Sequence, residues 1–203
     1  MIIKNFLNIK NNKKIKKDFL NLLKDQPQLF ETLKPTYNYS YSKKAISKYK
    51  KFSNIRVIGM GGSILGTEAI YDFLKKKIKK KLTFVNNLNS NADYFKDKNI
   101  NLNLIISKSG NTLETIANAN TLIKSKDRNI IITENKDSYL TNLARKLKAE
   151  IFEHKNYIGG RYSVLSEVGM LPAELMNLNE GKFKQFNNLI KNKIFVNNLV
   201  NNV

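Results

Sequence analysis

Five short apolar runs, each rich in β-branched residues, constrain the fold of this chain more than any other feature. Runs of this kind suit strands that are covered on both faces. The stretches between them are long enough for helices, so the alternation predicts an α/β fold with a doubly wound, mostly parallel sheet flanked by helices. The runs are IRVIG (55–59), LTFV (82–85), NLIIS (103–107), NIIITE (129–134) and EIFEH (150–154).

The segments on either side of these runs have a helical pattern. Apolar residues fall at helical spacing in 12–24, which predicts an amphipathic helix. The last part of the chain contains no further strand series, and we expect Pro172 to interrupt its first helix. The sequence thus predicts an N-terminal helical extension over 1–50, the sheet domain over 51–155 and a helical segment over 156–203.

One of the stretches between the strand runs shows its helical face clearly. In SILGTEAIYDFLKKK, Leu65, Ala69 and Phe73 fall on one side of a helix.

The charge of the chain is strongly positive. Lys and Arg number 36 against 16 Asp and Glu, a formal net charge of +20, which alone would favour a nucleic-acid or membrane-surface partner. Lysine is over-used along the whole chain, however, and no nucleic-acid-binding motif accompanies it. We therefore interpret the charge as a compositional bias and expect no nucleic-acid partner.

The chain has no cysteine, which excludes disulfides, a thiolate nucleophile and zinc–thiolate sites and fits a reducing compartment. The first residues lack the apolar core of a signal peptide, and no run approaches the roughly 18 apolar residues of a membrane span. We expect a soluble, cytoplasmic protein with no membrane partner and no metal.

Two glycine- and hydroxyl-rich loops follow two of the predicted strands. The first is GMGGSILG (59–66), whose glycines allow close approach of backbone to a ligand and in which Ser63 offers a hydroxyl. The second is SKSGNTLET (107–115), where a helix is expected to begin near Thr112. Ligands of parallel α/β sheets bind beyond the carboxyl ends of strands, at helix N-termini. Together the loops predict a cradle for a phosphate.

A purely structural interpretation stays open for each loop taken alone. Glycines after a strand often only form a turn, and Asn111 with Glu114 could cap a helix. The loops match neither the dinucleotide-binding fingerprint nor the Walker motif. Hydroxyls without a Walker lysine suit a phosphate monoester on a small substrate.

A third segment, GGRYS (159–163), places an arginine after two glycines. The fixed charge of Arg161 can stabilise an anion that develops during a reaction, although an ordinary surface arginine in a turn is the alternative. We interpret His154, the sole histidine, as a structural or solvent-facing residue at a strand end.

Taken together, GMGGSILG, SKSGNTLET and GGRYSVLSEVGMLPAEL resemble the glucose-6-phosphate isomerase family in order and approximate spacing. The first half of these proteins is a sugar isomerase (SIS) domain. The resemblance covers about 54–175. Generic SIS domains share versions of the first two loops, whereas the run from Gly159 to Pro172 is typical of phosphoglucose isomerase in particular.

The resemblance implies a SIS fold for 51–155 and isomerisation of glucose 6-phosphate and fructose 6-phosphate through a cis-enediol, a step of glycolysis and gluconeogenesis. It implies no metal or organic cofactor, and a homodimer for the full-length enzyme. Arg161 would steady the enediolate. The substrate phosphate would be held by Ser63, Ile64, Ser107, Lys108, Ser109, Gly110, Asn111 and Thr112.

The sequence departs from the family in two respects. Ser109, Gly110 and Asn111 stand where the family more often has threonine, phenylalanine and threonine, which brings this loop closer to generic SIS domains. The family's glutamate base, ring-opening histidine and C-terminal lysine belong to a second SIS domain, towards which 156–203 would lead. We therefore expect an N-terminal portion of the enzyme that is inactive alone. A stand-alone SIS module that binds a sugar phosphate without catalysis is the alternative.

Overall fold

The computed structural model describes the 203-residue chain except residues 1–11, 26–27, 29, 89–99, 186–191 and 202–203. The chain divides into two compact units, one formed by 38–180 and the other by 1–37 with 181–203. The larger unit contains the sheet. It also takes in 38–50 and 156–180, on either side of the predicted sheet domain over 51–155.

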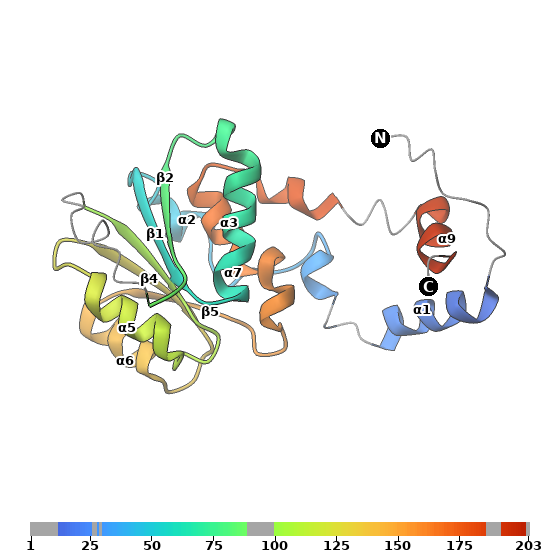
Figure 1. Cartoon of the computed structure of the whole chain (residues 1–203), viewed down its shortest axis with the longest axis horizontal. Helices are drawn as coiled ribbons and strands as arrows, with labels where there is room; N and C mark the ends of the chain where they lie inside the picture. Colours follow the sequence, from blue (N-terminus) through green and yellow to red (C-terminus); the bar gives the residue numbers. More distant parts are fainter. Residues whose placement is uncertain (1–11, 26–27, 29, 89–99, 186–191, 202–203) are drawn as a thin grey trace. The chain divides into compact units, whose positions relative to one another are not determined.

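The larger unit is built on a parallel five-stranded sheet with the strand order β2-β1-β3-β4-β5 (Figure 1). Each strand coincides with one of the apolar runs, so the predicted α/β fold is confirmed. From β1 the chain moves outward to β2 and then returns to the other side of β1, so the strand order reverses between β1 and β3. The strands are β1 (Asn54–Gly59), β2 (Lys81–Val85), β3 (Leu102–Ile106), β4 (Arg128–Thr133) and β5 (Glu150–Glu153).

Helices cover both faces of this sheet (Figure 1). On one face, α5 (Leu113–Leu122) and α6 (Tyr139–Leu147) pack on the strands and bury Ile58, Ile105 and Ile131 beneath them. On the other face lie α3 (Gly62–Leu74) and α7 (Glu167–Leu175), which pack against each other and against η3 (Gly160–Leu165). The doubly wound arrangement places the loops after β1 and β3 at the same edge of the sheet.

Further elements complete the two units. The helix predicted at 12–24 is α1, which contacts α9 in the smaller unit, where Lys16 Nζ donates to Asn197 Oδ1 at 3.0 Å. The remaining elements are α1 (Lys13–Asp25), η1 (Glu31–Leu33), α2 (Lys43–Ser47), η2 (Lys75–Lys77), η4 (Glu180–Gln185) and α9 (Lys193–Asn201).

Pro172 does not interrupt its helix, contrary to the expectation from the sequence. Helix α7 continues through it from Glu167 to Leu175. Proline lacks the N–H that would bond the carbonyl four residues earlier, which is that of Val168. The buried hydroxyl of Thr67 on α3 donates to this carbonyl at 3.1 Å instead. A side chain of the neighbouring helix thus replaces the missing backbone donor.

Helix α3 forms as predicted, but it packs through a different face. Leu65 and Phe73 are 56% and 88% exposed, whereas Ile64, Thr67 and Ile70 are buried. The reason is a close contact between α3 and η3, which the spacing of apolar residues in the sequence does not predict. A Cβ atom at Gly66 would lie 2.7 Å from Cγ2 of Val164 in η3, so α3 meets η3 along its small residues.

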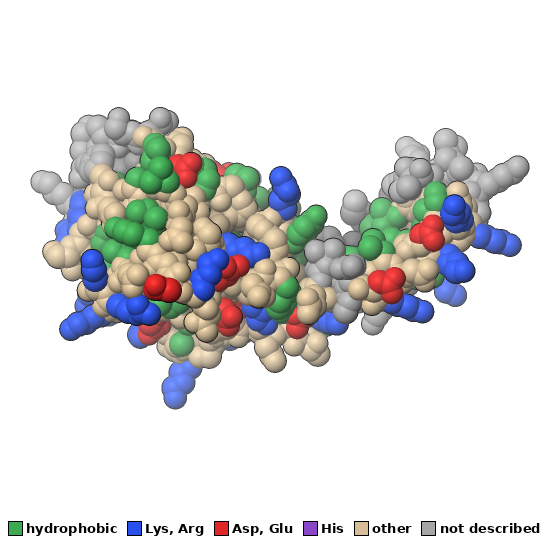
Figure 2. Space-filling view, turned by 90° about the horizontal axis from the view of Figure 1, so that it is seen from below, with side chains coloured by type: hydrophobic (Ala, Val, Ile, Leu, Met, Phe, Trp, Pro, Cys, Tyr) green, Lys and Arg blue, Asp and Glu red, His purple; other side chains and the backbone are tan. Residues whose placement is uncertain are grey.

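Basic side chains are spread over the face of the molecule that Figure 2 draws. In the view of Figure 2, Lys and Arg side chains stand among acidic and uncharged residues rather than in a single patch. Within the part of the chain that the structure describes, no helix combines the length and the apolar character that crossing a membrane requires.

Candidate functional site

The two hydroxyl-rich loops leave adjacent strands at the same edge of the sheet. Gly59 at the end of β1 is paired with Ile106 at the end of β3, and Ser107 follows directly. A Cβ atom at Gly59 would lie 3.0 Å from the carbonyl oxygen of Ile106. The strand order reverses here, and ligands of such sheets bind in the crevice at the reversal. The sequence-predicted loops therefore lie side by side at the expected edge.

The GGRYS segment is attached to the first of these loops. Any Cβ atom at Gly62 would overlap the carbonyl group of Gly160. The hydroxyl of Ser163 donates to the carbonyl of Gly62 at 3.2 Å and to that of Gly160 at 2.7 Å. Gly61, just before α3, has a positive φ of 54°. All three sequence-predicted segments thus have their backbones at one edge of the sheet.

Ser63 and Ile64 form the first turn of α3 and contribute differently. Their N–H groups donate to the carbonyls of Met60 at 3.2 Å and Gly61 at 3.0 Å, which closes the turn. The side chain of Ile64 is fully buried in the core. Ser63 is half-buried beside Gly59. Of this pair, only Ser63 presents a polar side chain close to the strand ends.

Three hydroxyl groups of the second loop form a cluster. The Ser107 and Thr112 oxygens are 2.8 Å apart, and the Ser109 oxygen lies 3.5 Å from each of them. Backbone N–H groups of Gly110 and Asn111 donate to Ser107 Oγ and Ser109 Oγ, both at 3.2 Å. Hydroxyls can act as donors or acceptors, so the cluster can turn its hydrogens towards an anion.

The hydroxyl cluster lies at the N-terminus of α5. Thr112 is the N-cap residue, yet its side chain makes no capping hydrogen bond. From the sequence, Asn111 could have capped this helix. Its side-chain oxygen instead accepts a hydrogen bond from Tyr139 N at 2.8 Å. The Thr112 hydroxyl and the two serine hydroxyls near it therefore lie beside a helix end that carries a partial positive charge.

Residues from β4 and α6 hold the second loop in place. Gly110 has a φ of 70°, and a Cβ atom there would overlap the hydroxyl of Ser138. Its carbonyl accepts from Leu140 N at 3.1 Å, and the Lys108 carbonyl accepts from Glu134 N at 3.1 Å. These bonds fix the backbone before any ligand arrives, which favours binding because less conformational freedom is lost.

Sequence reasoning missed the supporting role of the segment between β4 and α6. Ser138 and Thr141 exchange hydrogen bonds in a capping box at the start of α6. This Ser-x-x-Thr spacing was visible in the sequence as a helix start. Its contact with Gly110 was not, because it joins residues of two different loops.

The ammonium group of Lys108 is engaged beside the cluster. Lys108 Nζ donates to the Asn156 carbonyl at 2.6 Å and lies 3.8 Å from Glu134 Oε1. The hydrogen bond from Lys136 holds the pKa of Glu134 below its usual range, with Lys108 adding to the effect. His154, only 1% exposed, lies at the end of β5, and burial lowers its pKa.

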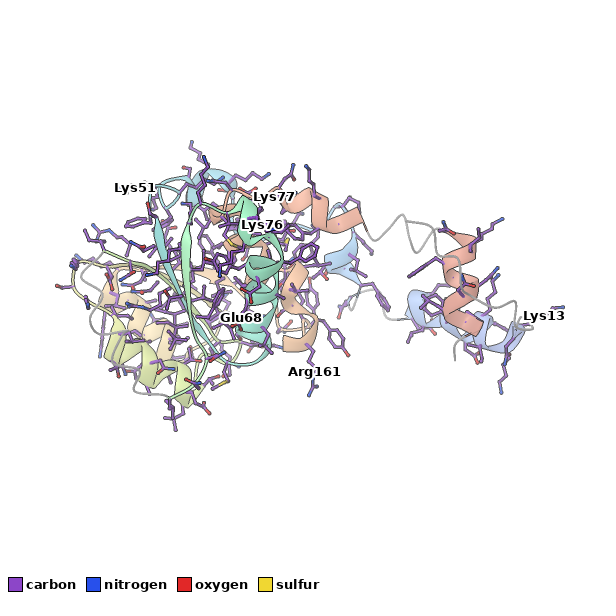
Figure 3. All side chains as sticks on the ribbon, turned by 45° about the horizontal axis from the view of Figure 1, so that its top comes forward. Lys13, Lys51, Glu68, Lys76, Lys77 and Arg161 are labelled. Carbon is purple, nitrogen blue, oxygen red and sulfur yellow. The ribbon has the colours of Figure 1, made fainter. Side chains whose placement is uncertain are left out.

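The structure does not bring the guanidinium of Arg161 to the cluster. Arg161 is exposed on η3, and its side chain extends away from the sheet (Figure 3). The backbone of its segment is held beside the start of α3 by the hydrogen bond from Ser163 to the Gly62 carbonyl. Glu167, the first residue of α7, is fully buried, and its Oε1 accepts from Ser40 N at 2.9 Å.

Comparison with known proteins assigns the family. The family model described as phosphoglucose isomerase matches residues 7–200. The chain belongs to the phosphoglucose isomerase family. A glucose-6-phosphate isomerase of Onion yellows phytoplasma is 34% identical over 165 residues, which cover 70% of this chain and 38% of that protein. The chain spans less than half the length of the isomerases it matches.

Solved structures show the same fold at low sequence identity. A hypothetical protein of Thermus thermophilus has a TM-score of 0.67 and 19% identity, covering 95% of this chain and 55% of that one. Tagatose-6-phosphate ketose/aldose isomerase of Escherichia coli has a TM-score of 0.55 and 16% identity, covering 91% and 54%. The sheet domain of this phosphoglucose isomerase family member thus has the fold of phosphosugar isomerases, as the sequence predicted.

Proposed function

We propose that the hydroxyl cluster of Ser107, Ser109 and Thr112 holds the phosphate of glucose 6-phosphate or fructose 6-phosphate. The observation that carries this proposal is the meeting of three hydroxyls within 3.5 Å at the N-terminus of α5. A phosphate dianion accepts hydrogen bonds from such groups and is stabilised by the helix dipole. Ser63, at the adjacent strand end, supplies a fourth hydroxyl.

The other residues of the second loop act through shape and position. Gly110 permits the positive φ that turns the loop, and the Asn111 side chain links it to α6 through Tyr139. Lys108 contributes long-range positive charge while its ammonium stays bonded to Asn156. Ile64 fixes the first turn of α3 from the core.

The reaction is proposed to be the aldose–ketose isomerisation of the family, through a cis-enediol. Arg161 would swing from solvent towards the bound sugar and stabilise the enediolate charge. The resemblance places the proton-transferring groups in a second SIS domain, and each such group contributes roughly 10² to 10⁴ in rate. The 203-residue chain alone would therefore bind the substrate without converting it. We also propose that the full-length enzyme is a homodimer in the cytoplasm.

Titration calorimetry with fructose 6-phosphate tests the phosphate site. Removing two hydroxyls with Ser109→Ala plus Thr112→Ala should weaken binding by about 100-fold or more, because hydrogen bonds to charged groups contribute roughly 1.5–3 kcal/mol each. Thr121→Ala is the matched control, since this exposed hydroxyl lies at the far end of α5 and donates to the Ala117 carbonyl of its own helix. Equal affinity of the double variant and the control would refute the site.

The alternative function, a SIS module that binds a sugar phosphate without catalysis, predicts the same binding result. Activity of the full-length natural polypeptide separates the two functions. Conversion of fructose 6-phosphate supports the isomerase, whereas binding without conversion supports the module.

A further inference from the structure

The segment that joins α3 to β2 carries a dense run of lysine. Six of the seven residues over 75–81, the basic segment, are lysine. Strand β2 is an edge strand of the sheet, so the basic segment lies at the rim of the larger unit. Helix α3 runs back from the carboxyl ends of the strands, which places this segment at the opposite edge from the hydroxyl cluster. In Figure 3, Lys76 and Lys77 lie near one end of α3 and Arg161 near the other.

Most ammonium groups of the basic segment have no partner in the part of the chain that the structure describes. Lys80 Nζ donates to the Phe52 carbonyl at 2.8 Å, and Lys75 Nζ lies 5.8 Å from the centre of the Tyr71 ring. The other four lysines are exposed, and their ammonium groups make no hydrogen bond or ion pair with any described residue. These four are Lys76, Lys77, Lys79 and Lys81. Their positive charges are therefore available to an anionic partner.

An exposed aromatic ring lies beside these lysines. Phe73, in the last turn of α3, is 88% exposed, and among the described residues no ring or cation contacts its own ring. With Asp72, Leu74 and the first three lysines of the basic segment, it lines a hollow of about 470 Å³. Asp72 is the one acid of this lining, and it is exposed. This end of α3 thus combines a projecting apolar group with a surplus of positive charge.

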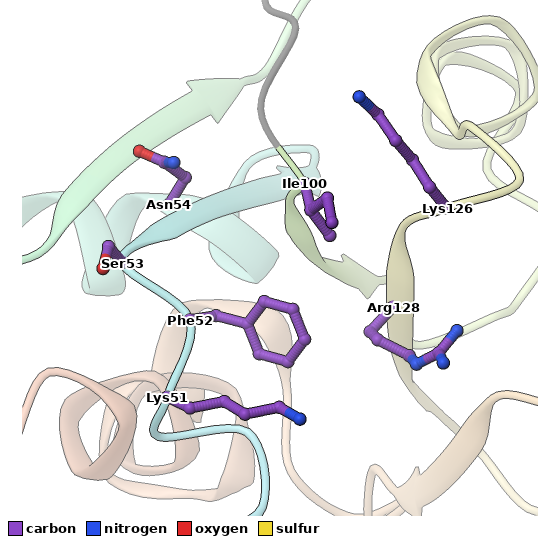
Figure 4. Close-up of a pocket in the computed structure, with 7 residues that line it drawn as sticks. All are labelled: Lys51, Phe52, Ser53, Asn54, Ile100, Lys126 and Arg128. Carbon is purple, nitrogen blue, oxygen red and sulfur yellow. The ribbon is translucent and has the colours of Figure 1, made fainter.

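Another basic hollow at the same edge of the sheet lacks this combination. It has a volume of about 540 Å³ and lies at the amino ends of β1, β3 and β4 (Figure 4). Its aromatic ring, that of Phe52, is half-buried, and Lys51 Nζ already lies 5.7 Å from the centre of the ring. The ring of Phe73 is therefore the better candidate for an external partner.

We propose that Phe73 with Lys76, Lys77, Lys79 and Lys81, the Phe73 surface, binds an anionic lipid membrane. The four ammonium groups would contact the negatively charged lipid headgroups, and the ring of Phe73 would enter the boundary between headgroups and acyl chains. Charge complementarity favours this partner, because clusters of basic residues of this size are typical of segments that bind anionic membranes. The apolar boundary layer also accounts for an aromatic ring that the fold leaves in water.

Binding to a membrane surface requires no spanning helix. From the sequence we expected no membrane partner, because lysine is over-used along the whole chain and no run could span a bilayer. The structure adds that the lysines of one segment are unpaired within its described part and lie next to an exposed ring. A single projecting ring also differs from a nucleic-acid surface, on which successive bases stack along a groove. The hydroxyl cluster, at the opposite edge of the sheet, would stay open to solvent.

Co-sedimentation of the 203-residue chain with phospholipid vesicles tests the proposal. Vesicles of phosphatidylcholine with about 30% phosphatidylserine should bind the chain saturably at about 0.1 M salt. Vesicles of phosphatidylcholine alone should bind it at least about 10-fold more weakly. Raising the salt to about 1 M shortens the Debye length from roughly 10 Å to 3 Å and should remove most of the binding. Equal binding to both kinds of vesicle, or binding to neither, would overturn the proposal.

Variants of the Phe73 surface locate the contact. Lys76→Gln plus Lys77→Gln should weaken vesicle binding about 30-fold, because each lysine near an anionic surface is worth roughly a factor of five. Phe73→Ala should weaken it about 10-fold, since the ring no longer enters the apolar layer. Lys146→Gln plus Lys148→Gln is the charge-matched control, because these exposed lysines lie at the end of α6, on the other face of the sheet. An equal loss in this control would overturn the proposal, since binding would then reflect net charge.

Two measurements separate the membrane from other macromolecules. Phe73→Ala should leave the binding of a single-stranded oligothymidylate unchanged; a loss equal to that for vesicles would assign the Phe73 surface to a nucleic acid. Sedimentation velocity should give the same mass for this variant and the parent chain. A dimer that Phe73→Ala abolishes would assign the ring to a second copy of the chain. Either result would overturn the inference.

The same vesicles distinguish the Phe73 surface from the proposed substrate site and from a contact inside a longer protein. Fructose 6-phosphate should not displace the chain from vesicles; displacement would place the lipid phosphates in the hydroxyl cluster and overturn the inference. The full-length natural polypeptide should bind vesicles as well, and a failure to bind would assign Phe73 to a contact with the rest of that polypeptide. Far-ultraviolet circular dichroism of each variant should match that of the parent chain, which shows that the fold is retained.

Discussion

The hydroxyl of Thr67 on α3 donates at 3.1 Å to the carbonyl of Val168 on α7, the carbonyl that Pro172 leaves without its helical donor. Both residues are buried. This bond joins α3, which begins in the GMGGSILG loop, to α7, which follows the GGRYS segment. The contact between α3 and α7 thus includes a hydrogen bond from Thr67 that replaces the one lost at Pro172.

Thr67→Val should lower the free energy of unfolding by about 1–3 kcal/mol, because it leaves the buried carbonyl of Val168 unsatisfied. A double-mutant cycle with Pro172→Ala tests the cause, since alanine restores the backbone N–H. In the Pro172→Ala background, Thr67→Val should cost clearly less, as measured by urea denaturation. An equal cost in both backgrounds would show that the hydroxyl does not replace the missing donor.

Gly62→Ala should destabilise the chain by about 1–3 kcal/mol, the usual cost of overpacking, because its Cβ atom would overlap Gly160. Gly160→Ala is the matched control. A Cβ atom at Gly160 would lie 3.8 Å from Gly62 Cα, which is an ordinary contact. Thermal unfolding measures the stability that each variant loses. Similar losses of stability in the two variants would contradict the close approach of Gly62 to Gly160.

Stability should fall in mildly acidic solution because of His154. Burial lowers the pKa of this imidazole in the folded chain, so its contribution is fully present above the ordinary value of 6.5 and is lost as the pH falls below it. Urea denaturation at pH 7.5 and 5.5 should show a smaller loss in His154→Gln than in the parent chain. Glu134 titrates in a separate window below 4.5, since its pKa is lowered. Identical losses in both proteins would exclude His154 as the source.

Arg161→Ala in the full-length natural polypeptide should lower kcat much more than it changes KM, because the guanidinium acts on charge that develops during the reaction. Its exposure implies a change in stability within about 0.5 kcal/mol. Arg161→Lys should restore part of kcat, since it keeps the charge without the planar fork. Steady-state kinetics decide the matter, and an effect confined to KM would assign Arg161 to binding alone.

The sheet and the position of the two loops that are predicted to bind a ligand followed from local patterns in the sequence. Five β-branched runs predicted the strands, and the rule that ligands bind at the carboxyl ends of parallel strands placed Ser63 and Ser107 at one edge. These inferences succeeded because each depends on the order of residues within one short segment.

Contacts between residues that are far apart in the sequence could not be predicted from local patterns. The packed face of α3 follows from the fit of Gly66 against Val164, which are about a hundred positions apart in the chain. The link from Asn111 to Tyr139 and the rescue of Pro172 by Thr67 also depend on contacts between different elements. Local propensity alone allowed Asn111 to cap a helix and predicted that Pro172 interrupts one.

Backbone amide shifts during a fructose 6-phosphate titration test the central claim most directly, because they locate the phosphate without any substitution. We expect the largest ¹H–¹⁵N shifts at 107–115, with smaller ones at 62–64, where the first loop enters α3. Shifts that are largest at the other edge of the sheet, at 51–54 and 126–128, would contradict the account. So would a titration that leaves the amides of the hydroxyl cluster unchanged.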